Sequence, residues 1–308
     1  MAAKILMAGS IMIDLILQMK RVPNPSESVL GTSYSNAGGG KGSNSAVAAA
    51  KAGGDVSVCC TLGKDSNGEA LLGMLKDVNV DTSNVVLAEG ANTGMAVIML
   101  EESGMNRIAI YTGANDITSP EAVEAAFDGK EYDALMMQLE IPLESNLKAF
   151  EIAKSRGMIT CLDAGPAQEY PIEKFDGITI LSPNETETDA LVGILPVDEK
   201  TSLEASKILK ERSNCKYVVL KLGDKGSFIY GDDICQMVPT FKVDAVDPTA
   251  AGDCFTGVLV KKYTETGDIV ASARYASAAA ALSVQKLGAQ PSLPNKEEIE
   301  AFLAERGA

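Results

Sequence analysis

The segment DPTAAGDCFTG, residues 247–257, is the most informative stretch of this 308-residue chain. It places small residues at 250–252 before a carboxylate, Asp253, where an irregular segment is expected to turn into a helix. Free backbone N–H groups at a helix start attract anions, and small side chains let an anion approach them. Asp253 is then placed to take a proton from a hydroxyl nucleophile, as phosphoryl transfer requires. The alternative is a purely structural role, in which Asp253 is an ordinary Asp in the first turn of a buried helix.

Outward from this segment, short apolar runs alternate with helical patterns. Apolar runs bounded by turn residues are typical of buried strands, and longer segments with a 3.6-residue period are typical of helices. The alternation predicts an α/β fold with a mostly parallel sheet covered by helices on both faces. We expect strands at 4–8, 56–62, 132–137, 158–162, 178–181 and 217–220, and helices after 42, at 67–77, at 143–156, from 185, from 203, and at 252–265, 268–285 and 296–304.

Two segments, 11–37 and 93–112, interrupt the alternation with extended, partly alternating patterns and no helical period. We expect them to form a small antiparallel sheet inserted into one α/β domain, whose core comprises 1–10, 38–92 and 113–308. Such a sheet has an apolar face to bury, so it would act as a lid over a site or pair with a second subunit. The alternative is a surface hairpin without a role.

Composition excludes several kinds of partner and chemistry. Lys plus Arg number 27 and Asp plus Glu number 42, and the net charge of −15 repels nucleic acid and anionic lipid surfaces. No apolar run is long enough to span a membrane, so we expect a cytoplasmic protein. The six cysteines are scattered, which predicts reduced core thiols. Because histidine is absent, Ser-His-Asp and Cys-His hydrolases are excluded, and acid–base chemistry falls to carboxylates or lysines.

Three further motifs carry polar groups toward a ligand. The run GGGKGSN at 38–44 lets backbone approach a ligand but has neither Walker A nor dinucleotide spacing; a tight turn is its alternative. Amide and carboxylate groups such as Asp14, Asn44 and Glu140 suit a polyhydroxylated ligand. The run SPNETE at 182–187 follows a strand and suits Mg²⁺ bound through waters, or an ordinary helix start. The run LGDKG at 222–226 suits a nucleotide, or a hairpin turn.

With these motifs in this order, the chain resembles the ribokinase-like carbohydrate kinases over nearly its whole length. Residues 40–44 are similar to the first signature of that family, residues 184–187 to its Mg-ATP motif and residues 247–257 to its second signature. Residues 113–115, 138–140 and 288–292 are also similar to the family's pattern.

The resemblance implies a Rossmann-like three-layer core, a β-lid that commonly joins two subunits, and transfer of the ATP γ-phosphoryl group to the 5-hydroxyl of D-ribose. It makes Asp253 the general base and the N–H groups of Ala250, Ala251 and Gly252 the anion hole. The resemblance implies that the sugar is bound by Met12, Asp14, Gly40, Lys41, Asn44, Glu140 and Asp253. It implies that the nucleotide is bound by Asn184, Lys221, Gly223, Asp224, Gly226, Gly252 and Ser277, with Glu187 reaching Mg²⁺ through water. It also implies that a monovalent cation, K⁺, is bound by Asp247, Thr249, Ser283, Lys286, Gly288 and Ser292.

Two residues depart from the family's usual pattern. Met12 stands where ribokinases usually have an Asn that faces the sugar, and deoxyribokinases of the family tend to carry Met there. A thioether tolerates a missing hydroxyl, whereas an unpaired polar group penalises it, so 2-deoxy-D-ribose rivals D-ribose as substrate. Pro248 replaces the usual Thr, which removes one N–H beside the expected cation loop.

Other functions remain open at this point. A sugar-phosphate kinase would need more cations near the sugar than Lys41, and a purine nucleoside kinase would need an aromatic platform, for which the first lid segment offers only Tyr34. An inactive sugar-binding regulator is opposed by the intact Gly252 and Asp253. An α/β oxidoreductase is opposed by the missing dinucleotide fingerprint.

Overall fold

The computed structural model describes residues 2–307 and contains two β-sheets. The larger sheet has nine strands in the order β13-β12-β11-β10-β9-β8-β1-β4-β5. Every pair from β5 to β11 is parallel, and β12 and β13 add an antiparallel edge. The predicted mostly parallel sheet is thus confirmed. Its strands are β1 (Lys4–Ala8), β4 (Asp55–Gly63), β5 (Asp81–Ala88), β8 (Ala134–Met137), β9 (Ile159–Asp163), β10 (Ile180–Ser182), β11 (Tyr217–Lys221), β12 (Ser227–Gly231) and β13 (Cys235–Val238).

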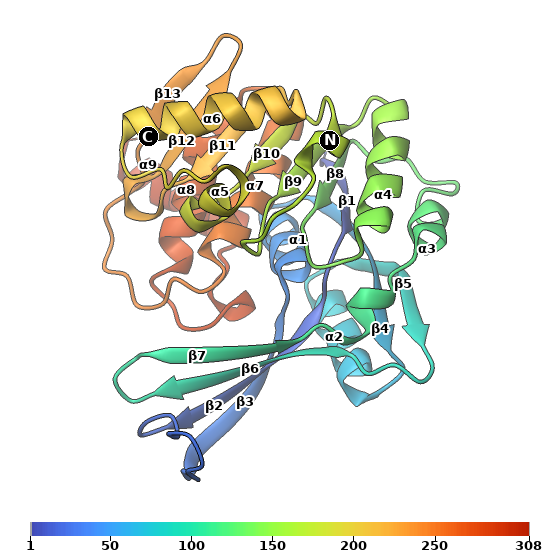
Figure 1. The fold of residues 1–308 in the computed structure, drawn as a ribbon, viewed down its shortest axis with the longest axis vertical. Helices are drawn as coiled ribbons and strands as arrows, with labels where there is room; N and C mark the ends of the chain where they lie inside the picture. The colour runs from blue at the N-terminus through green and yellow to red at the C-terminus, as the bar shows by residue number, and fades with distance from the viewer. Residues whose placement is uncertain (1, 308) are drawn as a thin grey trace.

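Helices cover both faces of this sheet, as Figure 1 shows. The central strand β1 is apolar throughout because its successive side chains enter two different cores: Ile5 and Met7 pack on one face, Leu6 and Ala8 on the other. The first core includes α1 (Lys41–Lys51), α2 (Ser66–Asp77), α7 (Ala251–Thr266), α8 (Ile269–Ser283) and α9 (Lys296–Glu305), and the second includes α3 (Pro120–Ala125), α4 (Leu143–Ser155), α5 (Glu185–Val192) and α6 (Glu199–Ser213).

The smaller sheet projects from the α/β body as a separate arm (Figure 1). It has the strand order β3-β2-β6-β7 and is built from two hairpins. Their positions agree with the two segments expected to form a lid. The strands are β2 (Met12–Met19), β3 (Gly31–Gly39), β6 (Gly94–Glu101) and β7 (Asn106–Tyr111).

The pairing within this lid differs in one respect from the expected antiparallel sheet. Each hairpin is antiparallel, but the central pair, β2 and β6, is parallel, with Met12 opposite Gly94. The reason is that both hairpins leave the α/β body with their first strand, so these two strands run in the same direction. The alternating patterns predicted the strands but not this direction.

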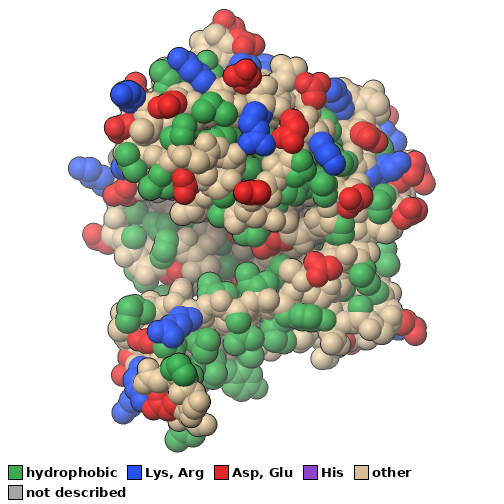
Figure 2. Space-filling view, viewed as in Figure 1, with side chains coloured by type: hydrophobic (Ala, Val, Ile, Leu, Met, Phe, Trp, Pro, Cys, Tyr) green, Lys and Arg blue, Asp and Glu red, His purple; other side chains and the backbone are tan. Residues whose placement is uncertain are grey.

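The root of the lid lies beside the carboxyl ends of the parallel strands, where ligands bind in open α/β sheets. Chain segments after β1, β9, β10 and β11 all reach this edge. Figure 2 shows the surface hollowed between the lid and the α/β body, with acidic side chains visible in the depth. Among the described residues, no helix has the length and apolar character needed to cross a membrane.

Candidate active site

The start of α7 presents unpaired backbone donors. The residue before the helix, Ala250, has a left-handed backbone (φ 60°) and supplies no side-chain cap. Within residues 2–307, the N–H groups of Gly252 and Asp253 have no hydrogen-bond acceptor, whereas Ala251 donates to the carbonyl of Pro248 at 3.2 Å. The N–H group of Ala250 likewise has no acceptor among the described residues. Of the three N–H groups expected to form an anion hole, those of Ala250 and Gly252 are therefore free, and Asp253 offers a further free donor at this helix start.

Asp253 is buried and held by residues of α1. Its side chain accepts a hydrogen bond from Asn44 Nδ2 at 2.9 Å, and its other oxygen lies 3.5 Å from Lys41 Nζ. The Oδ1 atom of Asn44 is buried and has no partner among the described residues. The carboxylate is therefore oriented by one amide, and the same amide keeps a free acceptor for a hydroxyl group.

Two further carboxylates face this base. Asp14 on β2 is 7 % exposed and accepts no hydrogen bond from the residues described. Burial, and then the charges of Asp253 and Glu140, raise the pKa of Asp14 to about 7. Glu140 accepts hydrogen bonds from Ser10 Oγ and the backbone N–H of Lys41, and burial raises its pKa as well. A buried carboxylate without a protein partner calls for donors from a ligand.

Glycines bring the lid and α1 close to these groups. A Cβ atom on Gly39 would lie 2.0 Å from Asp14 Oδ1, and one on Gly42 would lie 2.7 Å from the backbone of Ser10. Gly40 has φ 90° and stands 3.0 Å from the Met12 nitrogen by the same construction. The predicted glycine run is therefore required by close backbone approach, and Met12 is buried at the root of the lid beside Gly94.

The other end of the site combines lysines and carboxylates. Asn184 caps α5 and forms a capping box with Glu187. Glu187 is buried, and its Oε1 lies 3.4 Å from Lys41 Nζ. Lys41 thus lies between Glu187 and Asp253, and its pKa is raised because those carboxylates outweigh the effect of burial. The segments predicted separately, 40–44, 184–187 and 247–257, meet here.

This arrangement agrees with the result of comparing the chain with known proteins. The profile of the pfkB family of carbohydrate kinases matches residues 2–296. The chain belongs to this family. Ribokinase from Haemophilus influenzae is 36 % identical over 296 residues, which cover 96 % of each chain. Deoxyribokinase from Salmonella typhi is 32 % identical and covers 96 % of this chain and 97 % of its own. The structure of Arabidopsis thaliana ribokinase complexed with ribose and ATP has a TM-score of 0.89 at 31 % identity and covers 98 % of this chain and 99 % of its own.

As a pfkB carbohydrate kinase, the chain carries a ribokinase-type fold and is a phosphotransferase. The expected nucleotide residues lie on neighbouring elements. Lys221 forms an isolated bridge with Asn184, and the 3₁₀ helix η3 (Gly223–Lys225) follows at once. Gly223 and Gly226 have φ values of 53° and 105°, so this stretch, including Asp224, is also the turn into β12. Ser277 is buried on α8, which packs against α7.

Four of the six residues expected to bind a cation lie in two loops, at 247–249 and 286–288, and the other two, Ser283 and Ser292, lie at the end of α8 and in the 3₁₀ helix η4 (Gln290–Ser292). Asp247 holds them together: it accepts from the backbone N–H and hydroxyl of Thr249 and from the N–H of Gly288. Within residues 2–307, the carbonyl oxygens of Asp247, Thr249, Lys286 and Gly288 accept no hydrogen bond. Free carbonyls fit a monovalent cation, and Pro248 leaves these contacts intact because none of them needs its N–H. Of the other expected residues, Ser283 and Ser292 are buried nearby in sequence, and Lys286 pairs with Glu298.

Fewer protein groups are available to bind Mg²⁺ than to bind the monovalent cation. The described residues contain no group of three or more His, Cys, Asp or Glu side chains that would hold a metal. Glu187 is partly engaged by the Asn184 N–H. This fits Mg²⁺ held mainly by phosphate and water, with Glu187 reached through water.

Several residues in the site were not predicted. Asp163 ends β9 and binds Lys221; Thr256 and Ser10 hydrogen-bond to site carboxylates; Gln290 donates to Ser43 at 2.6 Å. The sequence does carry a signal for Asp163, because an acid at the end of an apolar strand lies at the ligand-binding edge of the sheet. Thr256 and Gln290 lie within the runs 247–257 and 288–292 that resemble the family's pattern, but the pattern gives them no separate role. Ser10 is ordinary in sequence, and only the fold brings it to the site.

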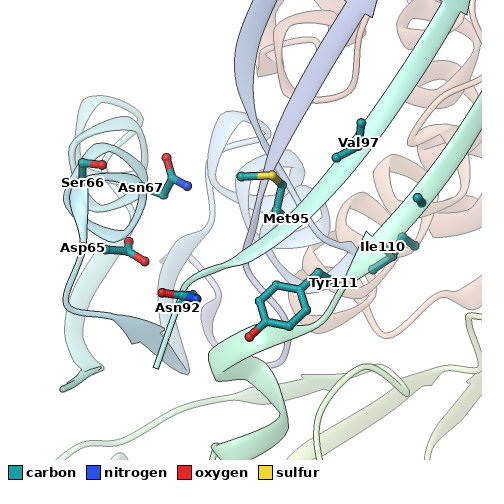
Figure 3. Close-up of a pocket in the computed structure, with 9 residues that line it drawn as sticks. Asp65, Ser66, Asn67, Asn92, Met95, Val97, Ile110 and Tyr111 are labelled. Atoms are coloured by element: carbon teal, nitrogen blue, oxygen red, sulfur yellow. The ribbon is translucent and has the colours of Figure 1, made fainter. Parts of the chain in front are cut away.

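An apolar pocket near the lid is not part of this site. Figure 3 shows it between the start of α2 and the lid, with a volume of about 410 Å³. In the β2–β6 register Met95 pairs with Ile13 and Ala96 with Asp14. Because alternate residues point to opposite faces, Met95 and Val97, which line the pocket, face away from Asp14.

Proposed function

We propose that this kinase transfers the γ-phosphoryl group of ATP to the 5-hydroxyl of D-ribose. The proposal depends on the arrangement of Asp14, Asn44 and Asp253. The Asp14 carboxylate and Asn44 Oδ1 are buried acceptors without protein partners, and they lie beside the Asp253 carboxylate, at a helix start with free N–H groups. A neutral polyol supplies the missing donors, and the helix start receives the phosphate. Relatives that match nearly the full length include ribokinases, and the ribokinase structure from Arabidopsis thaliana is a complex with ribose and ATP.

In this mechanism Asp253 accepts the proton of the sugar hydroxyl. The hydroxyl oxygen forms a bond to the γ-phosphorus while the bond to the β-phosphate oxygen breaks, so ADP leaves and the proton passes from Asp253 to solvent. Asn44 orients the base. The N–H groups of Gly252 and Asp253 stabilise the charge on the moving phosphoryl group, together with Lys41.

Two metal ions would complete this site. Mg²⁺ bound with ATP would be reached from Glu187 through water and would neutralise phosphate charge. A monovalent cation, K⁺, would be held by Asp247 and the free carbonyls of its two loops, and it would stabilise the loop that leads into α7. Equal activity in potassium chloride and in choline chloride would exclude the cation site.

A second candidate substrate is 2-deoxy-D-ribose. Met12 is buried at the lid root and offers no hydrogen bond. A thioether leaves no polar group unpaired when a sugar hydroxyl is missing, so it does not discriminate against the deoxy sugar. Deoxyribokinases are also among the relatives, at 32 % identity.

The test is a substrate panel. ADP release from ATP with Mg²⁺ is measured with D-ribose, 2-deoxy-D-ribose, fructose, fructose 6-phosphate and nucleosides. The proposal expects the highest kcat/KM with a free pentose. Preference for the sugar phosphate or a nucleoside would contradict it, and absence of turnover with every acceptor would favour an inactive sugar-binding regulator.

The lid is also proposed to join two copies of the chain. Ile108 and Ile110 on β7 are 51 % and 56 % exposed, and they pair with Ile98 and Ala96 on the lid face that carries Asp14. Exposed apolar residues on a sheet arm are costly unless covered. A second lid of the same kind would cover them.

A further inference from the structure

A buried ion pair lies directly behind the start of α7. Asp163 at the end of β9 and Lys221 at the end of β11 are joined by a 2.6 Å contact between Oδ2 and Nζ, and their side chains are 4 % and 9 % exposed. The hydroxyl of Thr256 on α7 donates to the same oxygen at 2.7 Å. The second oxygen of Asp163, Oδ1, is buried without a partner among the described residues. The pair therefore connects two strands with the catalytic helix.

The Lys221 side chain runs along Gly252. A Cβ atom on Gly252 would lie 3.8 to 4.0 Å from the Cδ, Nζ and Cε atoms of Lys221. An ammonium group has three donors. Asp163 takes one, and the Thr256 hydroxyl at 3.4 Å is in reach of a second. Glu187 Oε2 is 3.9 Å away, beyond hydrogen-bond distance, so a donor remains for an anion near the Gly252 N–H.

The charge of Lys221 depends on its neighbours. Burial alone would lower the pKa of Lys221, but Asp163 and Glu187 outweigh burial and the repulsion of Lys41, and its pKa is raised. The titratable groups around it are Asp163 and Cys161 on β9, Glu187 on α5 and Lys41 on α1. The Cys161 thiol stays neutral because burial raises its pKa far above the ordinary value.

A buried ion pair is not explained by stability. Removing two charges from water offsets most of their attraction, and an apolar pair of the same size is often as stable. The pair as a whole is neutral, but it fixes the position of one ammonium group in the core, at the edge where three site segments meet. This is a use that apolar residues would not serve.

We propose that Asp163 is a positioning residue: together with Thr256 it holds the Lys221 ammonium beside Gly252, where this ammonium meets the phosphate end of ATP. The inference rests on the proposed function, because it needs ATP as the donor. It adds a residue, Asp163, and a role for the pair that the substrate assignment does not contain.

The first experiment measures binding of ATP and AMP by calorimetry without sugar. Lys221→Met should weaken ATP binding roughly 10- to 100-fold, the value of one hydrogen bond to a charged group, and leave AMP within about twofold. Lys216→Met is the matched control, because it removes a positive charge directly before the opposite end of the same strand. It should bind ATP like the wild type.

The second experiment measures the dissociation constants of ATP and AMP for Asp163→Asn at pH 7. Without the carboxylate that holds it, the Lys221 ammonium is no longer directed at the place beside Gly252. ATP affinity should then fall roughly 10-fold or more while AMP affinity stays within about twofold. A purely structural role would change thermal stability, or weaken both nucleotides alike, but would not separate ATP from AMP.

A double variant, Asp163→Asn with Lys221→Met, guards against misfolding. It leaves no unpaired buried charge, so it should recover thermal stability relative to either single variant, yet retain the weak ATP binding of Lys221→Met. Wild-type ATP affinity in Lys221→Met, in Asp163→Asn or in the double variant would overturn the inference. If the wild type binds no ATP, the proposed function fails and the inference with it.

Discussion

Gly257 on α7 lies against the backbone carbonyl of Ser45 on α1, so closely that a Cβ atom on Gly257 would be 2.2 Å from that oxygen. The two helices therefore cross backbone to backbone one turn after Asp253. This crossing lets Asn44, the neighbour of Ser45, reach the Asp253 carboxylate at 2.9 Å. The orientation of the proposed base thus depends on a residue that touches no ligand.

Gly257→Ala should push α1 and α7 apart. The added methyl group cannot fit beside a main-chain oxygen, so we expect a loss of roughly 1–3 kcal/mol in stability by overpacking and a clear fall in kcat. Thermal denaturation and steady-state kinetics measure both. Gly73→Ala on α2 is the control, since its Cβ meets nothing within 4 Å and an exposed helical Ala is favoured over Gly by about 1 kcal/mol. A Gly257→Ala enzyme with wild-type kcat would contradict the role of the crossing.

Asp253→Asn should remove the proton acceptor and keep the shape of the site. We expect kcat to fall by a factor of about 10² or more while sugar and ATP still bind. Calorimetry with each ligand separates loss of chemistry from loss of binding. Wild-type turnover in this variant would exclude Asp253 as the general base.

Sugar binding should depend on pH through Asp14. The pKa of Asp14 is about 7, so the carboxylate is neutral in the free enzyme below that pH and accepts fewer hydroxyl hydrogen bonds. We expect kcat/KM for the sugar to fall by up to tenfold per pH unit below about pH 7. A pH profile of kcat/KM, measured at sugar concentrations well below KM, tests this. The decrease below about pH 7 should disappear in Asp14→Asn.

The same residue should oppose stability at neutral pH. Asp14 binds a proton in the folded chain but not in the unfolded chain between its ordinary pKa of 3.8 and about 7. The fold therefore loses stability as pH rises through this window, and the loss is complete above it. Asp14→Asn should stabilise the unliganded protein by about 1–2 kcal/mol at pH 8 and by little at pH 4. Denaturant titration at both pH values checks this, and an equal effect at both would refute it.

Met12→Asn should change the choice of pentose. An amide at the lid root would hydrogen-bond a sugar hydroxyl and would be left unpaired by the deoxy sugar. We expect the ratio of kcat/KM for ribose over deoxyribose to rise by roughly 10-fold or more relative to the wild type. Met12→Leu is the apolar control and should leave the ratio unchanged. If the wild type itself prefers ribose by a hundredfold or more, the deoxyribose candidate is excluded.

Ile110→Glu should disrupt association through the lid. We expect the wild type to be a dimer and the variant a monomer, because a charge would be buried in an apolar contact. Light scattering after size exclusion measures the mass of each. Val86→Glu on β5, which replaces an exposed apolar residue outside the lid, should remain dimeric. A monomeric wild type would contradict the proposal.

Much of the fold followed from local patterns. The apolar runs at β1, β4, β9 and β11 are buried on both faces, so hydrophobicity alone marks them. The edge strand β5 was not predicted: its first half, DTSN, is polar, and the short apolar run at 85–88 is exposed or half-buried rather than part of a core. Helix α6 starts at Glu199 rather than near 203. Its N-terminus is set by a capping box between Asp198 and Thr201, and its first turn is polar, so the spacing of apolar residues does not reveal it.

The sequence by itself determined the α/β class, the lid segments and the residue types of the site, because strand burial, glycine runs and helix starts are local properties of the chain. Only the tertiary structure decided which groups meet. The Asp163–Lys221 pair joins residues 58 positions apart and Asn44–Asp253 joins residues 209 apart. Charges and pKa values depend on such distances and on exclusion of water, and both arise only when the strands and helices have packed together.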